Sequence, residues 1–327
     1  MFQNADTDMI QYIVILLDDT STSFCNYKNA NTERKLIPLQ TLKDGIRYAM
    51  KENLNIQFVY PNYVLPIEYQ EAIDSIDHTD IKPSVYADNA NVVVFDSLAE
   101  TKGYAFKKDI AYLVHTDKNS LFDESETIIE LLAKVTRLNV VINDIETFKE
   151  NDFAAYRLLL SKLTERLEQI YASVKSPQLN LLTDRMMLDK MNNCGAGDTT
   201  ITLAPDGKFY VCPAFYLSTD GYSVGDLTNG LDIKNSQLYK LDHAPICRNC
   251  DAFQCKRCIW LNRKTTFEVN TPSHEQCVVA HLERNASRVL LLNIRKHGAF
   301  LPDKEITGQR KSTGGVFYFI VFCIFAL

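Results

Sequence analysis

Along the first 185 residues, short runs of apolar residues alternate with segments in which apolar residues recur at helical spacing. This pattern predicts alternating strands and helices. Short β-branched apolar runs predict strands at Tyr12–Leu17, Ile56–Tyr60, Asn91–Phe95, Ile110–His115, Arg137–Asn143 and Leu179–Leu182. Helical spacing of apolar residues predicts helices over Leu36–Asn53, Tyr69–Ser75, Glu124–Thr136 and Ala154–Ser173. Strands that alternate with helices pair in parallel through right-handed crossovers. We therefore expect an α/β fold, a partial (β/α) barrel of about six strand–helix units.

The composition changes near Met186, where helical periodicity gives way to turns, glycines and cysteines. This change predicts an α/β domain over residues 1–185 and a small cysteine-rich domain over residues 186–282. The apolar spacing of Val278–Ile294 predicts a further helix. Residues 283–327 are expected to hold most of this helix and a C-terminal tail.

Composition and charge narrow the class of protein. The 327 residues are 46% hydrophobic and 23% charged, as in ordinary soluble proteins. The net charge of −6 argues against a general nucleic-acid binder, because such binding needs a basic face. The N-terminus has no basic region and no small-residue cleavage site, so no secretory signal is expected. We expect a cytoplasmic protein.

Two apolar segments bear on membrane binding. Met9–Leu17 and Val316–Leu327 are both much shorter than the ~20 residues of a spanning helix. The first segment is interpreted as a buried strand. The second is a strand or interface segment, an incomplete membrane tail, or a C-terminus altered by a frameshift. No membrane partner is expected.

Cysteines are the most informative residues of the chain. Nine are present, and seven of them lie from Cys194 to Cys277. In a reducing cytoplasm, clustered cysteines bind metal more often than they form disulfides. The order is Cys194-x17-Cys212, then Cys247-x2-Cys250-x4-Cys255-x2-Cys258, then Cys277. Two close CxxC pairs are compatible with one zinc ion, but zinc ribbons separate their pairs by a longer excursion, so iron–sulfur is favoured over zinc.

One segment resembles the opening of the SPASM domain, the iron–sulfur domain appended to radical-SAM peptide-maturing enzymes. It is Cys194, twelve residues, Gly207, the four residues KFYV, and Cys212-Pro213. The later cysteines follow the order of that family, although the middle spacings are four and two residues where the family commonly has five and three. Asp206-Gly207 marks a hairpin turn, and Gly225-Asp226-Leu227 resembles the turn between the two cluster regions.

The resemblance implies two auxiliary [4Fe–4S] clusters. Cys194, Cys212 and Cys258 would hold the first cluster, and Cys247, Cys250, Cys255 and Cys277 would hold the second. The family often takes a fourth ligand for the first cluster from a cysteine just upstream. No cysteine lies between Cys25 and Cys194, so this ligand is a non-cysteine group, a substrate thiolate or missing, or the first cluster is itself absent.

The radical-SAM signature itself is missing. Enzymes with this domain generally carry Cys-x3-Cys-x2-Cys after the first strand, where three thiolates leave one iron open to S-adenosylmethionine. The equivalent loop here, residues 18–27, contains only Cys25. Radical initiation and S-adenosylmethionine binding are therefore not expected, and the first domain is interpreted as a degenerate radical-SAM-like region.

This combination resembles the CXXX-repeat peptide maturase family. That resemblance implies an auxiliary maturation protein for a ribosomally synthesised cysteine-repeat peptide, acting with a companion radical-SAM enzyme. The alternative is a structural zinc or iron–sulfur module that binds a peptide or protein without redox activity. A third possibility is an enzyme with an unrecognised site in the first domain, so whether the chain is an enzyme stays open.

Other candidate residues have more ordinary interpretations. Cys25 is a nucleophile, a single cluster ligand or a simple thiol, and the last is favoured. His243, His274 and His281 flank the cysteines and could replace a ligand, but no HxxxH-type pair is present. Asp18 and Asp19 follow the first strand, at the edge where parallel sheets bind ligands, and are interpreted as turn or capping groups.

Overall fold

The computed structural model describes residues 10–173, 175–188, 191, 193–218, 221–253, 255 and 258–306. The chain forms two compact units, one of Met1–Val93 with Cys194–His243 and one of Val94–Asn193 with Ala244–Leu327. Each unit thus joins an early and a late stretch of the sequence. The boundaries expected from composition, at residues 185 and 282, stay a prediction.

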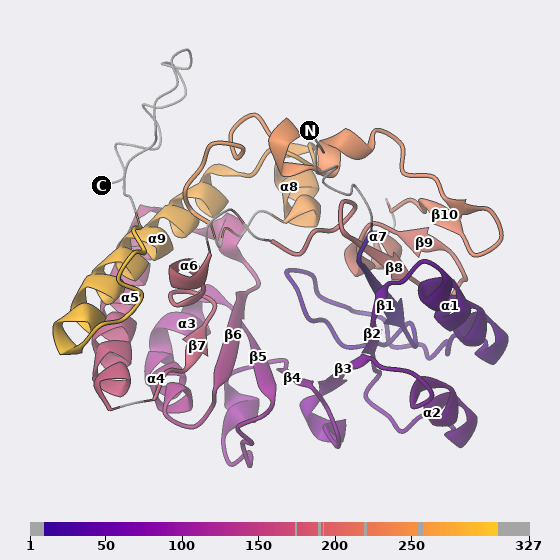
Figure 1. Ribbon diagram of the computed structural model, residues 1–327, viewed down its shortest axis with the longest axis horizontal. Coiled ribbons are helices and arrows are strands. Elements are labelled where there is room, and N and C mark those ends of the chain that lie inside the picture. Colours follow the sequence, from indigo (N-terminus) through magenta and orange to yellow (C-terminus); the bar gives the residue numbers. More distant parts are fainter. Residues whose placement is uncertain are drawn as a thin grey trace, which may run out of the picture. The chain divides into compact units, whose positions relative to one another are not determined.

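The sheet of the first unit has the strand order β3-β2-β1-β8-β9 (Figure 1). The bounds are β1 Tyr12–Leu16, β2 Asn55–Val59, β3 Thr79–Pro83, β8 Thr200–Leu203 and β9 Phe209–Tyr210. Both neighbours of β1 pair with it in parallel, and β9 pairs antiparallel with β8. Ile13 and Ile15 are completely buried, as expected for a continuous apolar run at the centre of a parallel sheet.

Two helices of the first unit begin directly after prolines. Helix α1 (Leu39–Lys51) follows Pro38 and α2 (Ile67–Ile73) follows Pro66, where the ring preorganises the chain and no backbone N–H is required. A Cβ at Gly45 would lie 2.4 Å from Leu203 Cδ2. Glycine at this position therefore lets α1 approach β8 closely.

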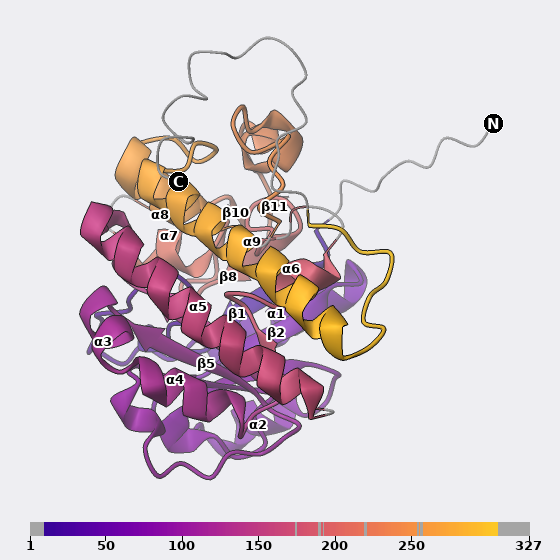
Figure 2. The same cartoon turned by 90° about the vertical axis from the view of Figure 1, so that its left-hand side faces the viewer.

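The second unit contains the parallel strands β5 (Ala111–Thr116), β6 (Arg137–Ile142) and β7 (Gln178–Leu179) in the order β7-β6-β5. β4 (Val92–Phe95) carries the chain from one unit into the other. The helices are α3 Lys118–Asp123, α4 Ser125–Leu132, α5 Glu150–Ala172 and α9 His274–Ile294. The two long helices α5 and α9 lie side by side (Figure 2).

The remaining helices and strands are short. They are the helices α6 Asp184–Met187, α7 Pro213–Leu217 and α8 Ile259–Thr266, and the antiparallel pair β10 Gly225–Asp226 and β11 Gly230–Leu231. Single 3-10 turns occupy Ser84–Tyr86, Ala99–Thr101, Ile145–Thr147, Ser236–Tyr239, Leu241–His243 and Arg295–His297.

The expected α/β class is confirmed, and each strand expected from an apolar run is present, although β7 is shorter than expected. The sequence pattern missed β3 and α3, and it placed the start of α9 four residues too late. In the described part of the chain, no helix has the length and apolar character needed to cross a bilayer. Residues 316–327, for which three interpretations were left open, lie outside the described residues.

Candidate metal centre and the loop after the first strand

The β8–β9 hairpin organises two of the predicted ligands. Gly207 in its turn has a φ of +79°, a conformation that favours glycine. The carbonyl of Gly195, next to Cys194, accepts hydrogen bonds from three following amides up to Thr200. β8 pairs with β9 through Thr202 and Tyr210. Cys212 lies two residues after β9 and Cys194 lies six residues before β8, so both lie on segments that extend from the same end of this antiparallel pair.

Tyr27 lies close to Cys25 and Cys212. Its side chain is buried, and its hydroxyl has no hydrogen-bond partner in the part of the chain that the structure describes. Burial raises the pKa of Tyr27 well above its usual value, and the charges of the Cys25 and Cys212 thiolates raise it further. A buried hydroxyl without a partner is costly. An acceptor such as cluster sulfide or a metal-bound thiolate beside Cys212 would satisfy it.

Polar side chains of the loop after β1 are hydrogen-bonded within the loop and to neighbouring segments. Asp18 is fully buried. Its Oδ1 accepts from the amide and hydroxyl of Thr20 at 2.8 and 2.6 Å, and its Oδ2 accepts from the Tyr63 hydroxyl at 2.8 Å. Ser21 donates to the Val59 carbonyl at the end of β2. These bonds fix the loop, at the sheet edge where parallel strands bind ligands, in one conformation.

A second contact connects this loop with the segment that follows Cys212. The hydroxyl of Tyr216, on α7, donates to Asp19 Oδ1. Burial, followed by this hydrogen bond, raises the pKa of Tyr216. α7 begins immediately after Cys212, so the loop and the Cys212 segment of the first unit are held together by a hydrogen bond to a carboxylate.

In the second unit, Cys247 and Cys250 lie on one tight turn. The Cys250 amide donates to the Cys247 carbonyl at 2.9 Å. The Ala252 amide donates to Cys250 Sγ at 3.5 Å. Cys247 is buried, whereas Cys250 is partly exposed. The spacing of two residues therefore produces the turn that a shared soft metal requires.

Helix α9 contacts this turn through side chains of its first turns. A capping box of Ser273 and Gln276 starts the helix, and Cys277 lies in its first turn. His281 Nε2 lies 3.6 Å from Cys250 Sγ. One turn further, Arg284 forms an ion pair with Asp251 that is largely buried. Cys250 and Asp251 therefore contact His281 and Arg284, which lie about one helical turn apart on α9.

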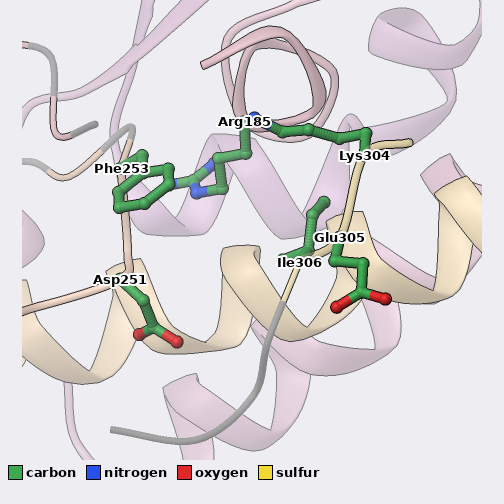
Figure 3. A pocket seen from close by; sticks show the side chains of 6 residues that line it. All are labelled: Arg185, Asp251, Phe253, Lys304, Glu305 and Ile306. Atoms are coloured by element: carbon green, nitrogen blue, oxygen red, sulfur yellow. The ribbon is translucent and has the colours of Figure 1, made fainter. Parts of the chain in front are cut away.

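A small pocket lies beside this turn. It has a volume of about 40 Å³ and is lined by Arg185, Asp251, Phe253, Lys304, Glu305 and Ile306 (Figure 3). Pockets for organic ligands are roughly ten times larger, so this one has room only for a few water molecules. Behind it, Glu283 of α9 accepts from the Tyr156 hydroxyl at 2.6 Å and pairs with Arg185 at 2.5 Å.

The predicted metal ligands are distributed over both units. Cys194 and Cys212 belong to the first unit, and Cys247, Cys250, Cys255, Cys258 and Cys277 belong to the second. Cys194 is exposed, and Cys212, Cys255, Cys258 and Cys277 are partly exposed. Within the described residues, no three His, Cys, Asp or Glu side chains converge in the manner of a preformed metal site. The two predicted ligand sets therefore stay a prediction.

The chemistry of the donors fits a soft metal. Thiolates and imidazole are ligands of zinc and of iron–sulfur clusters, and Cys250 already has a backbone N–H and an imidazole nitrogen against its sulfur. The unpartnered Tyr27 hydroxyl beside Cys212 points to the same conclusion in the first unit. In both units the residues present therefore fit the group that the cysteine pattern implies.

Four contacting residues had weak or no sequence signals. His281 follows Cys277 by one helical turn, a spacing that puts the two side chains on one face, but this inference required the helix to be placed first. The Asp251–Arg284 pair and the position of Tyr27 join residues far apart in the sequence or depend on loop conformation. No local pattern identifies such contacts.

The chain matches no protein-family model and no curated protein. It is similar to solved structures of anSMEcpe, a radical-SAM maturase with a SPASM domain. The structure with bound AdoMet is 12% identical, with a TM-score of 0.60 over 88% of this chain and 100% of that chain. The structure with AdoMet and Cp18Cys peptide is 13% identical, with a TM-score of 0.57 over 86% and 99%. At this identity the likeness shows the fold alone, an α/β fold that resembles that of anSMEcpe.

Proposed function

We propose that this chain is an auxiliary maturation protein for a ribosomally synthesised cysteine-repeat peptide of the CXXX type. It binds the precursor peptide and acts with a companion radical-SAM enzyme. Its cysteine-rich region holds one or two [4Fe–4S] clusters. The observation that carries the proposal is the likeness in fold to anSMEcpe over 88% of the chain. Two of the similar structures contain a peptide together with AdoMet.

The loop after β1 supports an auxiliary role. Three thiolates are needed to hold the cluster that chelates S-adenosylmethionine, and this loop has only Cys25. Its buried carboxylate, Asp18, is occupied by Thr20 and Tyr63. The companion enzyme therefore supplies radical initiation. This chain contributes a fixed loop at the sheet edge, where an extended peptide has backbone and side-chain groups to bind.

The metal ligands follow the SPASM resemblance. Cys194, Cys212 and Cys258 hold the first cluster, and Cys247, Cys250, Cys255 and Cys277 hold the second. When bound, such clusters relay electrons or accept a substrate thiolate at an open iron. The protein's own contribution is a backbone N–H that donates to Cys250 Sγ and a hydroxyl donor at Tyr27.

Anaerobic purification followed by iron, sulfide and zinc analysis tests the metal claim. We expect at least about four irons with equal sulfide per chain, and loss of iron in Cys212→Ser. A pull-down then tests the partner claim, with a cysteine-repeat peptide, the same peptide carrying serine in place of cysteine, and the companion enzyme present or absent. Retention of neither peptide under any condition would reject the role in maturation.

A structural-metal module without redox activity is the second candidate. It is favoured by the distance of 3.6 Å between Cys250 Sγ and His281 Nε2, because cysteine with histidine is a common ligand combination for structural zinc. Zinc without any iron, together with a peptide or protein that binds regardless of redox state, would select this function over the first.

A further inference from the structure

The second unit contains another possible set of metal ligands, which differs from the set that the SPASM resemblance implies. Cys247-x2-Cys250 lies on a turn, and Cys277-x3-His281 lies on the first turns of α9. A CxxC turn followed by two ligands one helical turn apart is the arrangement of zinc fingers, whose helical pair is separated by three to five residues. The pattern thus offers three sulfurs and one imidazole to a single ion.

The contact between Cys250 and His281 has the dimensions of two ligands on one metal. In tetrahedral zinc sites the Zn–S bond is about 2.3 Å and the Zn–N bond about 2.0–2.1 Å, which separates sulfur and nitrogen by about 3.6 Å. The observed distance from Cys250 Sγ to His281 Nε2 is 3.6 Å. In a [4Fe–4S] cluster held by four cysteines, each iron takes one protein ligand. The contact therefore fits a mononuclear ion better than a cubane cluster.

The remaining two ligands are tied to this pair by local structure. Cys277 is four residues before His281 on α9, so both side chains project from one face of the helix. Cys247 is held at the other end of the Cys250 turn by the amide-to-carbonyl hydrogen bond of 2.9 Å. The buried ion pair of Asp251 with Arg284 fixes the turn against the same helix face.

We propose that His281 is a metal ligand, and that Cys247, Cys250, Cys277 and His281 bind one zinc ion. The inference rests on the proposed function only in taking the cysteine-rich region to bind metal. It changes the second ligand set, because Cys255 is released from it. With His281 the candidate ligands number eight, and four thiolates remain outside this set, the number that one [4Fe–4S] cluster takes.

Metal analysis of the full chain, purified anaerobically, tests this assignment. We expect one zinc and about four irons per chain. His281→Ala should lose the zinc while keeping iron and sulfide, and His281→Cys should retain it, because a thiolate replaces the imidazole. His297→Ala is the matched control: this exposed histidine pairs with Glu168 in the same unit and should keep both metals.

Cobalt(II) substitution gives a readout that is independent of stability. Wild type should show the visible bands of tetrahedral cobalt with three sulfurs and one nitrogen, and His281→Cys should shift them to the pattern of four sulfurs. About eight irons without zinc in wild type, or the same zinc content in His281→Ala as in wild type, would overturn the inference and leave the proposed function standing. A chain that binds neither metal would reject both.

Discussion

The guanidinium of Arg185 and the carboxylate of Glu283 form an ion pair at 2.5 Å in which the side chains are 1% and 0% exposed. Arg185 also donates to the Leu181 carbonyl at 2.6 Å. The pair joins α6 to α9, the helix that carries Cys277 and His281. Burying two charges is costly, and their attraction offsets that cost only while both are present.

Arg185→Met should therefore lower the free energy of unfolding by about 3–5 kcal/mol, because the Glu283 charge is left buried without its partner. Chemical denaturation of the full chain measures this change. The matched control is Lys162→Met, since Lys162 lies 3.9 Å from Glu126 at the surface of the same unit and should change stability by less than about 1 kcal/mol. The double variant Arg185→Met/Glu283→Leu should recover part of the loss, and a loss equal to the sum of the two singles would contradict this explanation.

Tyr156→Phe removes the other hydrogen bond to Glu283. The Tyr156 hydroxyl is buried and donates to Glu283 Oε1 at 2.6 Å. A hydrogen bond to a charged group contributes about 1.5–3 kcal/mol, and the same denaturation experiment should show a loss of that size. In a cycle with Arg185→Met the two changes should not add, because both act on one carboxylate. Strict additivity would show that Tyr156 does not stabilise the Glu283 charge.

Much of the fold could be predicted from apolar runs, whereas β3 could not. Its sequence TDIKP has one apolar β-former, Ile81, between charged residues. The strand is nevertheless buried because Lys82 and Asp80 form an ion pair at 2.8 Å and Lys82 also lies over the Tyr60 ring. Hydrophobic periodicity cannot detect a strand whose charges neutralise each other inside the protein.

The candidate site was predictable where it depends on spacing and unpredictable where it depends on packing. The glycine turn of the β8–β9 hairpin and the Cys247–Cys250 turn follow from local sequence. The start of α9 was also encoded, since Ser273 and Gln276 form a capping box, but the apolar pattern alone begins later, at Val278. The approach of His281 to Cys250 depends on how α9 packs in the second unit, which no local signal contains.

Asp18→Ala tests the internal order of the loop after β1. The variant removes the acceptor of the Thr20 amide and of the Tyr63 hydroxyl, so hydrogen exchange at the Thr20 amide should be at least tenfold faster than in wild type, roughly 1.4 kcal/mol of lost protection. Asp226→Ala is the control, since Asp226 accepts from the Thr228 amide in the same way at a more exposed turn. Unchanged exchange at Thr20 would mean that the loop is held by other contacts.

Tyr171 gives the stability of the second unit a dependence on alkaline pH. Burial, and secondly the charge of Asp184, raises the pKa of Tyr171 to about 12. The folded state thus favours the protonated phenol relative to the unfolded chain, whose tyrosines have a pKa of about 10. This stabilisation is complete below pH 10 and is lost as the pH rises toward 12. Wild type should lose more stability than Tyr171→Phe over this interval, and parallel curves for the two proteins would contradict the assignment.

Arg284→Met tests whether the ion pair next to Cys250 supports metal binding. Arg284 and Asp251 are mostly buried, and the pair fixes the residue that follows Cys250 against α9. Residues that orient a ligand without binding the metal typically change metal affinity by about 10–100-fold. We expect zinc to dissociate from Arg284→Met faster by a factor in that range, measured by transfer to a coloured chelator. Lys264→Met, which breaks the more exposed pair with Glu146 in the same unit, should leave the rate unchanged. Equal rates in wild type and Arg284→Met would mean that the turn keeps its ligand geometry without α9.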